Sequence, residues 1–348
     1  MNVPAICDRC CNIAASISRM SLLVYLLSAI TLSAAFAAER GRPMVVGGTL
    51  KTDTGQIIRS GASVMVTGSA RDATNPAVWD AARALGLNTM RVGVKTTNAG
   101  KIVAQQLSVI DQVVEIARAQ RMYVMLLFGN APPGEFASDV VHRDNAIAFW
   151  KAAAPRYAKK ANVFYELVNE PEKWGNVVNW IGPAPNNTPT RVFEWIRQVY
   201  DATRAGAPDT VILLPSVANL QSFNGARRYV DILRKFEQMG PVNWSKTVWS
   251  FHYYNGTFSL GVNNNSAKDG GRAALSYIKA RYPILCTETN WWMEPPRSVL
   301  INGLEALEDV QVGWTLLRRP NQTTPPASPS MEEKLTAMRK AGRVIPVE

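Results

Sequence analysis

Apolar residues in this chain fall into short continuous runs, which alternate with longer segments where they recur every three or four positions. The short runs are typical of strands buried on both faces, and the longer segments predict amphipathic helices. Strands are expected at residues 62–68, 87–94, 122–129, 163–171, 211–216, 247–256, 283–290 and 311–317. Helices are expected at residues 76–86, 101–120, 145–160, 188–208, 225–239, 266–282, 297–310 and 331–342.

Eight strands separated by helices imply a parallel sheet. Eight such units in a chain of this length predict an α/β fold of the closed (β/α)8 type, the TIM barrel. A doubly wound open sheet is the alternative, but it usually has fewer strands, and no G-x-G-x-x-G motif follows the first strand. Asp53-Thr54-Gly55 is a run of turn-forming residues between two segments rich in β-forming residues. It predicts a short N-terminal β-hairpin that runs into the first strand.

The beginning of the chain reads as a leader. Residues 21–37 are an apolar run preceded by Arg9 and Arg19, and the run ends in Ala35-Phe36-Ala37, which matches the A-x-A cleavage pattern. We expect a secretory signal peptide at residues 1–37 and a single domain at residues 38–348. A retained membrane anchor is the alternative. We therefore expect a secreted or periplasmic protein with no membrane span after removal of the leader.

Composition narrows the possible partners. Hydrophobic residues make up 47% and charged residues 19% of the 348 positions, as in globular proteins. Cys286 is the only cysteine beyond the leader and the chain has two histidines, so we expect no disulfide, no metal and no cofactor. The net charge of +11 is not gathered into a basic run, so we expect no nucleic acid. We also expect a monomer.

Polar residues stand where several of the expected strands end, and the chemistry of a barrel lies at that edge. Arg91 lies toward the end of the second strand, Asn169 and Glu170 end the fourth, His252 is near the end of the sixth, and Glu288 ends the seventh. Two carboxyl groups that face each other across a barrel mouth can cleave a glycosidic bond. One donates a proton and the other serves as nucleophile or base.

Three motifs carry a resemblance to a known family. They are VNEP at residues 168–171, HYY at residues 252–254 and TET at residues 287–289. In this order the motifs resemble clan A of the glycoside hydrolases, most of all family 5, the cellulase family. The resemblance covers residues 45–318. Another clan A family, such as family 39, is the alternative.

The resemblance implies retaining hydrolysis through a covalent glycosyl-enzyme, with a role for each matching residue. Glu170 matches the acid/base and Glu288 the nucleophile. The supporting positions are Asn169 for the sugar 2-hydroxyl, Arg91 and the pair His252 and Tyr254 beside the nucleophile, and Trp314 as a platform for a sugar ring. Glu166 and Glu172 flank the acid, but Glu166 falls within the strand and Glu172 lies beyond Pro171.

The sequence departs from the family at two places that touch the sugar. The histidine that the family often has after strand three is replaced by Phe128, Gly129 and Asn130, and TNWW follows the nucleophile. Because aromatic faces stack on sugars, Trp291 and Trp292 are candidates for a substrate wall. The other histidine, His142, precedes a predicted helix and is interpreted as a surface residue.

We therefore expect an exported retaining glycoside hydrolase that acts on β-linked polysaccharide, with β-glucan as the substrate of a cellulase-like endoglucanase. Two other classes stay open. A transglycosylase that remodels cell-surface glucan would use the same residues. A barrel that binds polysaccharide without cutting it would lack one of the two acids, and both Glu170 and Glu288 are present.

Overall fold

The computed structural model describes residues 40–65, 73–94, 99–129, 139–169, 171, 190–215, 223–253, 266–289 and 306–316. All of them belong to one compact unit, residues 40–348. The expected leader at residues 1–37 and the expected last helix at residues 331–342 lie outside the described residues. Within the described ranges, none of the helices has the length and apolar character needed to cross a membrane.

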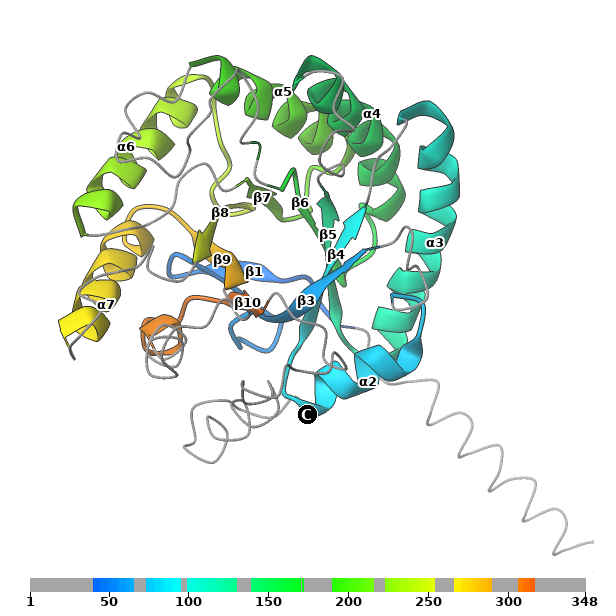
Figure 1. Ribbon diagram of the computed structural model, residues 1–348, viewed down its shortest axis with the longest axis horizontal. Helices are drawn as coiled ribbons and strands as arrows, with labels where there is room; N and C mark the ends of the chain where they lie inside the picture. The colour runs from blue at the N-terminus through cyan, green and yellow to red at the C-terminus, as the bar shows by residue number, and fades with distance from the viewer. Residues whose placement is uncertain are drawn as a thin grey trace, which may run out of the picture. The chain divides into compact units, whose positions relative to one another are not determined.

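Eight parallel strands form a closed ring (Figure 1). Each strand pairs with the next along the chain, and the last strand closes the ring by pairing with the first. The predicted (β/α)8 barrel is confirmed, because an open sheet would leave two strands without this final pairing. The strands are β3 (Arg59–Met65), β4 (Thr89–Val94), β5 (Tyr123–Phe128), β6 (Val163–Glu166), β7 (Ile212–Leu214), β8 (Thr247–Tyr253), β9 (Ile284–Thr289) and β10 (Trp314–Leu316).

Helices surround this ring on its outer side (Figure 1). The start of α2 (Pro76–Ala84) carries a local signal: Asn75 caps the helix by accepting a hydrogen bond from the backbone of Ala77 at 3.1 Å, and Pro76 occupies the first turn. The expected helix at 297–310 is described only from residue 306, and residues 306–309 are helical. The helices are α2 (Pro76–Ala84), α3 (Ala99–Ala119), α4 (Asp139–Tyr157), α5 (Thr190–Gly206), α6 (Phe223–Gln238) and α7 (Ser266–Lys279).

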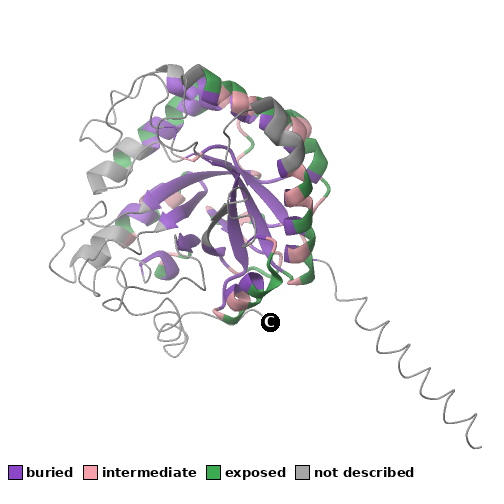
Figure 2. Ribbon diagram, turned by 45° about the vertical axis from the view of Figure 1, so that its right-hand side comes forward, coloured by how far each residue is buried: buried purple, intermediate pink, exposed green. Residues whose placement is uncertain are grey.

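Alternation along the strands divides the core into two clusters. Figure 2 shows the strands buried, while the helices are buried toward the strands and exposed on the outer side. Outward-facing side chains pack beneath the helices, as Met90 and Val92 do on β4. Inward-facing side chains fill the amino-terminal half of the ring: Leu50, Ile58, Tyr123, Met125, Phe164, Val211, Leu213, Val248 and Leu285. This inner cluster supports whatever lies above it, at the carboxyl ends of the strands.

A hairpin closes the amino-terminal end of the ring. β1 (Met44–Val46) pairs antiparallel with β2 (Thr49–Lys51), and Gly47 and Gly48 make the turn with φ of +57° and +72°. A side chain at Gly48 would overlap the Lys279 carbonyl. β2 also pairs with β9 through Thr49 and Ile284. The predicted turn at Asp53–Gly55 is confirmed by the hydrogen bond from Thr52 N to Gln56 O, but β1 is an additional strand.

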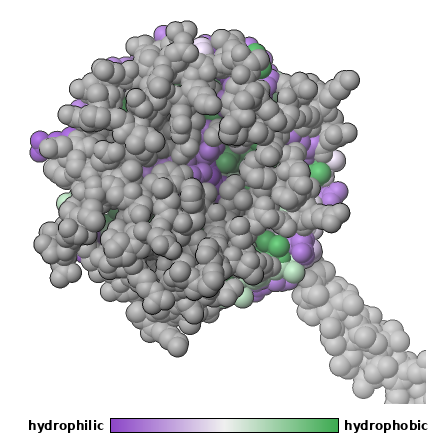
Figure 3. Space-filling model, viewed as in Figure 1, coloured by the Kyte–Doolittle hydropathy of each residue, from purple (hydrophilic) through white to green (hydrophobic). Residues whose placement is uncertain are grey.

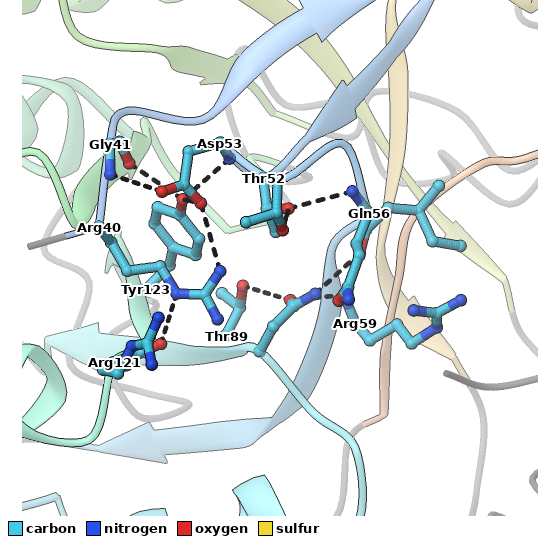
Figure 4. Close-up of polar contacts among 12 residues, drawn as sticks. Arg40, Gly41, Thr52, Asp53, Gln56, Arg59, Thr89, Arg121 and Tyr123 are labelled. Atoms are coloured by element: carbon cyan, nitrogen blue, oxygen red, sulfur yellow. Dashed lines mark hydrogen bonds and ion pairs between the residues drawn. The ribbon is translucent and has the colours of Figure 1, made fainter. Parts of the chain in front are cut away.

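Arg40, Gly41, Asp53, Arg121 and Tyr123 form a hydrogen-bonded group at the amino-terminal end of the ring, which we call the amino-end network (Figure 4). The Asp53 carboxylate accepts hydrogen bonds from Gly41 N at 2.7 Å, from Arg40 Nη1 at 3.2 Å and from the Tyr123 hydroxyl at 2.8 Å. Arg40 Nε donates to the Arg121 carbonyl. Burial by itself would raise the pKa of the Asp53 carboxyl, but the bonds from Tyr123, Gly41 and Arg40 outweigh it and hold that pKa below its ordinary value.

Candidate active site

One arginine organises the carboxyl-end side of the ring. Arg91 is an inward-facing residue of β4 and its side chain is fully buried. Its Nε and Nη2 bind the two oxygens of Glu166 on β6, at 2.6 and 2.8 Å. Nη1 donates to Glu288 Oε1 at 2.5 Å, and Nη2 also donates to Asn169 Oδ1 at 2.8 Å. We call Arg91, Glu166, Asn169, Glu288 and His252 the Arg91 cluster.

The guanidinium of Arg91 stays charged in this setting. Complete burial would lower the pKa of Arg91, but the charges of Glu166 and Glu288 and the hydrogen bonds to them outweigh burial and raise it above its ordinary value. One cation therefore serves two carboxylates. A bidentate arginine also fixes the orientation of its partners, because its donors lie in one plane.

A bulge in β9 aims Glu288 at the interior. Phe251 on β8 pairs with Cys286, and His252 pairs with Glu288, so Thr287 is an extra residue in the ladder. Strict alternation would place Glu288 on the outer side with Cys286, which packs in the outer core. Instead the Glu288 carboxylate reaches Arg91, and its Oε2 lies 3.4 Å from His252 Nδ1. The bulge thus lets one strand present a carboxylate toward β4 and β8 together.

Asn169 lies just beyond β6, partly exposed at the mouth of the ring. Its backbone N donates to the carbonyl of Phe128 at the end of β5, which anchors the segment after the strand. Its side-chain amide is fixed by Arg91, so the amide nitrogen points away from the guanidinium and can donate to another group. Pro171, two positions on, is buried and restricts the backbone.

The structure brings four of the predicted site residues together: Arg91, Asn169, His252 and Glu288. Glu170, Tyr254, Trp291 and Trp292 lie outside the described residues, so their positions in the site stay predictions. Across the described residues there is no group of three or more histidine, cysteine, aspartate or glutamate side chains that could hold a metal ion.

Trp314 does not join the cluster, and its predicted role as a platform is wrong for this structure. It pairs with Cys286 and, like it, packs in the outer core with an exposed fraction of 0%. Its indole nitrogen donates to Glu308 at 2.8 Å. A ring enclosed in this way has no face for a sugar. His142 is a second correction, since it is 5% exposed and its ring lies 5.4 Å from that of Phe128.

Glu166 is the site residue that the sequence did not assign. It is fully buried, and its carboxylate makes the bidentate pair with Arg91. The available signal was a charged residue in the middle of a buried strand, which is rare without a partner. Glu166 also stands an even number of positions after Phe164, which faces the barrel interior, so strand alternation places both on the inner face.

The fold and site together define a class: a (β/α)8 barrel with ionisable groups gathered at the carboxyl ends of its strands, where barrel enzymes carry their chemistry. Figure 3 shows hydrophilic residues, with a few hydrophobic ones beside them, at the centre of the face seen in Figure 1. The sequence model described as Cellulase (glycosyl hydrolase family 5) matches residues 53–316. The chain belongs to this family, which confirms the resemblance drawn from the motifs.

Relatives and solved structures agree with this assignment. Endoglucanase Z of Dickeya dadantii is 27% identical over 157 residues, which cover 45% of this chain and 30% of that protein. Endoglucanase MaCel5A of Microbulbifer sp. is 28% identical over 232 residues, covering 64% and 38%. The chain spans about a third of the length of the first curated relatives it matches.

Among solved structures, the β-glucanase SdGluc5_26A of Saccharophagus degradans, in complex with cellotetraose, superposes with a TM-score of 0.62 at 15% identity. The match covers 87% of this chain and 94% of that one. The catalytic domain of Thermobifida fusca endoglucanase Cel5A (E5) gives 0.59 at 16% identity, covering 86% and 97%. At such identities the likeness establishes the fold.

Proposed function

We propose that this protein is an exported retaining glycoside hydrolase that cleaves β-linked glucan, with Glu288 as nucleophile and Glu170 as acid/base. The observation that carries the proposal is the Glu288 carboxylate, held at the mouth of a family 5 barrel by Arg91 and lying beside His252. The endoglucanase relatives and the cellotetraose complex of the Saccharophagus β-glucanase favour a glucan as the substrate.

The geometry suits a nucleophilic carboxylate. Arg91 donates to Glu288 Oε1 and so binds the ionised form. In the first step a Glu288 oxygen attacks the anomeric carbon, the glycosidic bond breaks, and Glu170 gives its proton to the departing oxygen. In the second step Glu170 takes a proton from water, the water oxygen attacks the same carbon, and Glu288 leaves as a carboxylate. Two inversions at one carbon retain its configuration.

The neighbours of Glu288 have supporting roles in this proposal. Asn169 has its amide oxygen on Arg91, which leaves its NH2 group for the 2-hydroxyl of the sugar. Tyr254 would touch the nucleophile, and Trp291 and Trp292 would form the substrate wall. We further propose that residues 1–37 are a leader for export and that residues 38–348 are the single catalytic domain.

The test is hydrolysis of soluble β-1,4-glucan, β-1,3-glucan, mannan and xylan by residues 38–348, beside Glu170→Gln and Glu288→Gln. The matched control is Glu308→Gln, which changes another buried carboxylate to an amide outside the site. We expect hydrolysis of a β-glucan, with an initial product of retained configuration by NMR, abolished by the first two changes and kept in the control. Activity that survives Glu288→Gln, or an inverted product, would overturn the proposal.

A further inference from the structure

The bidentate contact between Glu166 and Arg91 determines which donors remain for the site. Glu166 occupies Nε and one hydrogen of Nη2, which is one edge of the guanidinium. The groups left over are Nη1, which donates to Glu288, and the second hydrogen of Nη2, which donates to Asn169. A rotation of the guanidinium would break all of these contacts together, so Glu166 fixes the direction in which Arg91 presents its donors.

The charges point to a second consequence. Two described groups face the Glu288 carboxylate: Arg91 from β4 and His252 from β8. Glu166 lies on the far side of Arg91, and the Cys286 thiol donates to the backbone carbonyl of Glu288. In the proposed reaction Glu288 becomes an ester and loses its negative charge. Among the described groups, a fully buried Arg91 would then have no counterion if Glu166 were neutral, and an unpaired buried charge is costly.

We propose that Glu166 is a positioning residue whose negative charge balances Arg91 during the reaction, so that Arg91 orients Glu288 without holding it too tightly as a carboxylate. With Glu166 ionised, Arg91 and Glu166 remain a neutral pair before and after the ester forms. With Glu166 neutral, the uncompensated cation favours the free carboxylate of Glu288 over the ester. This inference rests on the proposed function, because it assigns a role in that reaction.

The experiment compares Glu166→Gln, Glu166→Asp and the control Glu308→Gln. Glu308 also makes a buried bidentate pair, with Arg59, but this pair makes no hydrogen bond to the described residues of the Arg91 cluster. For Glu166→Gln we expect kcat on β-glucan to fall about 100-fold. We also expect the acid limb of the pH–rate profile to move to lower pH by about 1 unit, because a negative charge near Glu288 has been removed.

The other two variants separate charge from structure. Glu166→Asp keeps the charge with a shorter side chain, so its acid limb should stay at the wild-type pH even where kcat falls. Glu308→Gln should lower the melting temperature and leave both kcat and the acid limb unchanged. If the acid limb of Glu166→Gln stays at the wild-type pH, or if Glu308→Gln moves it as much, Glu166 acts only on folding and the inference is wrong.

A readout without substrate keeps this inference separate from the proposed function. The Glu288 carboxyl resonance in 13C-glutamate-labelled protein, assigned with Glu288→Gln, is followed from pH 3 to pH 8. We expect its titration midpoint to fall by about 1 pH unit in Glu166→Gln and to stay in Glu166→Asp. A midpoint that falls in a protein inactive on every glucan would show that Glu166 acts on the charge of Glu288, but it would refute the proposed function and with it the role in that reaction. An unmoved midpoint in an active protein would refute the inference and leave the proposed function standing.

Discussion

The two ends of the barrel handle carboxylate charge in opposite ways. In the amino-end network, Asp53 meets one arginine, one hydroxyl and one backbone amide, so the carboxylate is matched by groups of the fold itself. In the Arg91 cluster, one guanidinium is shared by two carboxylates and an amide. The first arrangement is complete without any ligand. The second leaves acceptor and donor capacity facing the mouth, which is what a site for chemistry requires.

The largest effect is expected from breaking the shared arginine. Arg91→Met leaves Glu166 and Glu288 buried without their cation. We expect the free energy of unfolding to fall by about 3–5 kcal/mol and kcat/KM on β-glucan to fall about 1,000-fold. Denaturant unfolding and steady-state kinetics measure the two. Arg91→Lys keeps the charge but loses the planar set of donors. If neither variant lowered the free energy of unfolding, Arg91 would not be holding Glu166 and Glu288 together.

A buried pair outside the site sharpens the comparison. Arg59→Met leaves the Glu308 carboxylate with the Trp314 indole as its remaining partner among the described residues, and it should lower the free energy of unfolding by about 3 kcal/mol. Because Arg59 lies away from the Arg91 cluster, kcat/KM per folded molecule should not change. Active-site titration with a mechanism-based inhibitor counts the folded molecules. A loss of kcat/KM comparable with that of Arg91→Met would mean that the two pairs are not independent.

The amino-end network should act on stability alone. The pKa of Asp53 is lowered in the folded protein, so its contribution is present above the ordinary aspartate pKa of about 3.9 and is lost as the pH falls through the lowered value. Asp53→Asn should therefore cost about 1–2 kcal/mol at pH 7 and almost nothing near pH 2. Urea unfolding at both pH values measures this.

Asp201→Asn is the matched control for Asp53→Asn, because Asp201 makes a surface pair with Arg197 and is 54% exposed. We expect it to change the free energy of unfolding by less than about 1 kcal/mol at either pH. An Asp53→Asn variant that loses activity in the folded state would show that the two ends of the barrel are coupled.

The smallest effect tests the placement of Trp314. Trp314→Phe removes the hydrogen bond from the indole to Glu308, which should cost about 1 kcal/mol. Its KM for glucan should stay at the wild-type value, because the ring is enclosed in the outer core. A several-fold rise in KM at unchanged stability would instead restore the platform role that the sequence predicted.

Much of this arrangement could be predicted from the sequence. The continuous apolar runs gave the strands, and the residues at their ends gave Arg91, Asn169, His252 and Glu288. Strand alternation does not reveal a bulge, so the inward turn of Glu288 after Cys286 rested on the motif alone. Trp314 was misplaced because its face depends on its register with Cys286. Glu166 was missed because its partner lies 75 positions away in the sequence.

The pairing of β3 with β10 has a consequence for how the protein folds. Arg59 and Glu308, which join this seam, are 249 positions apart. A chain emerging from the ribosome can pair β3 through β8 in order, but two strand edges stay unpaired until the last segments are made. Such distant pairings slow folding, and unpaired edges invite association with other chains. Ring closure is therefore the step at which newly made protein is most exposed to misassembly.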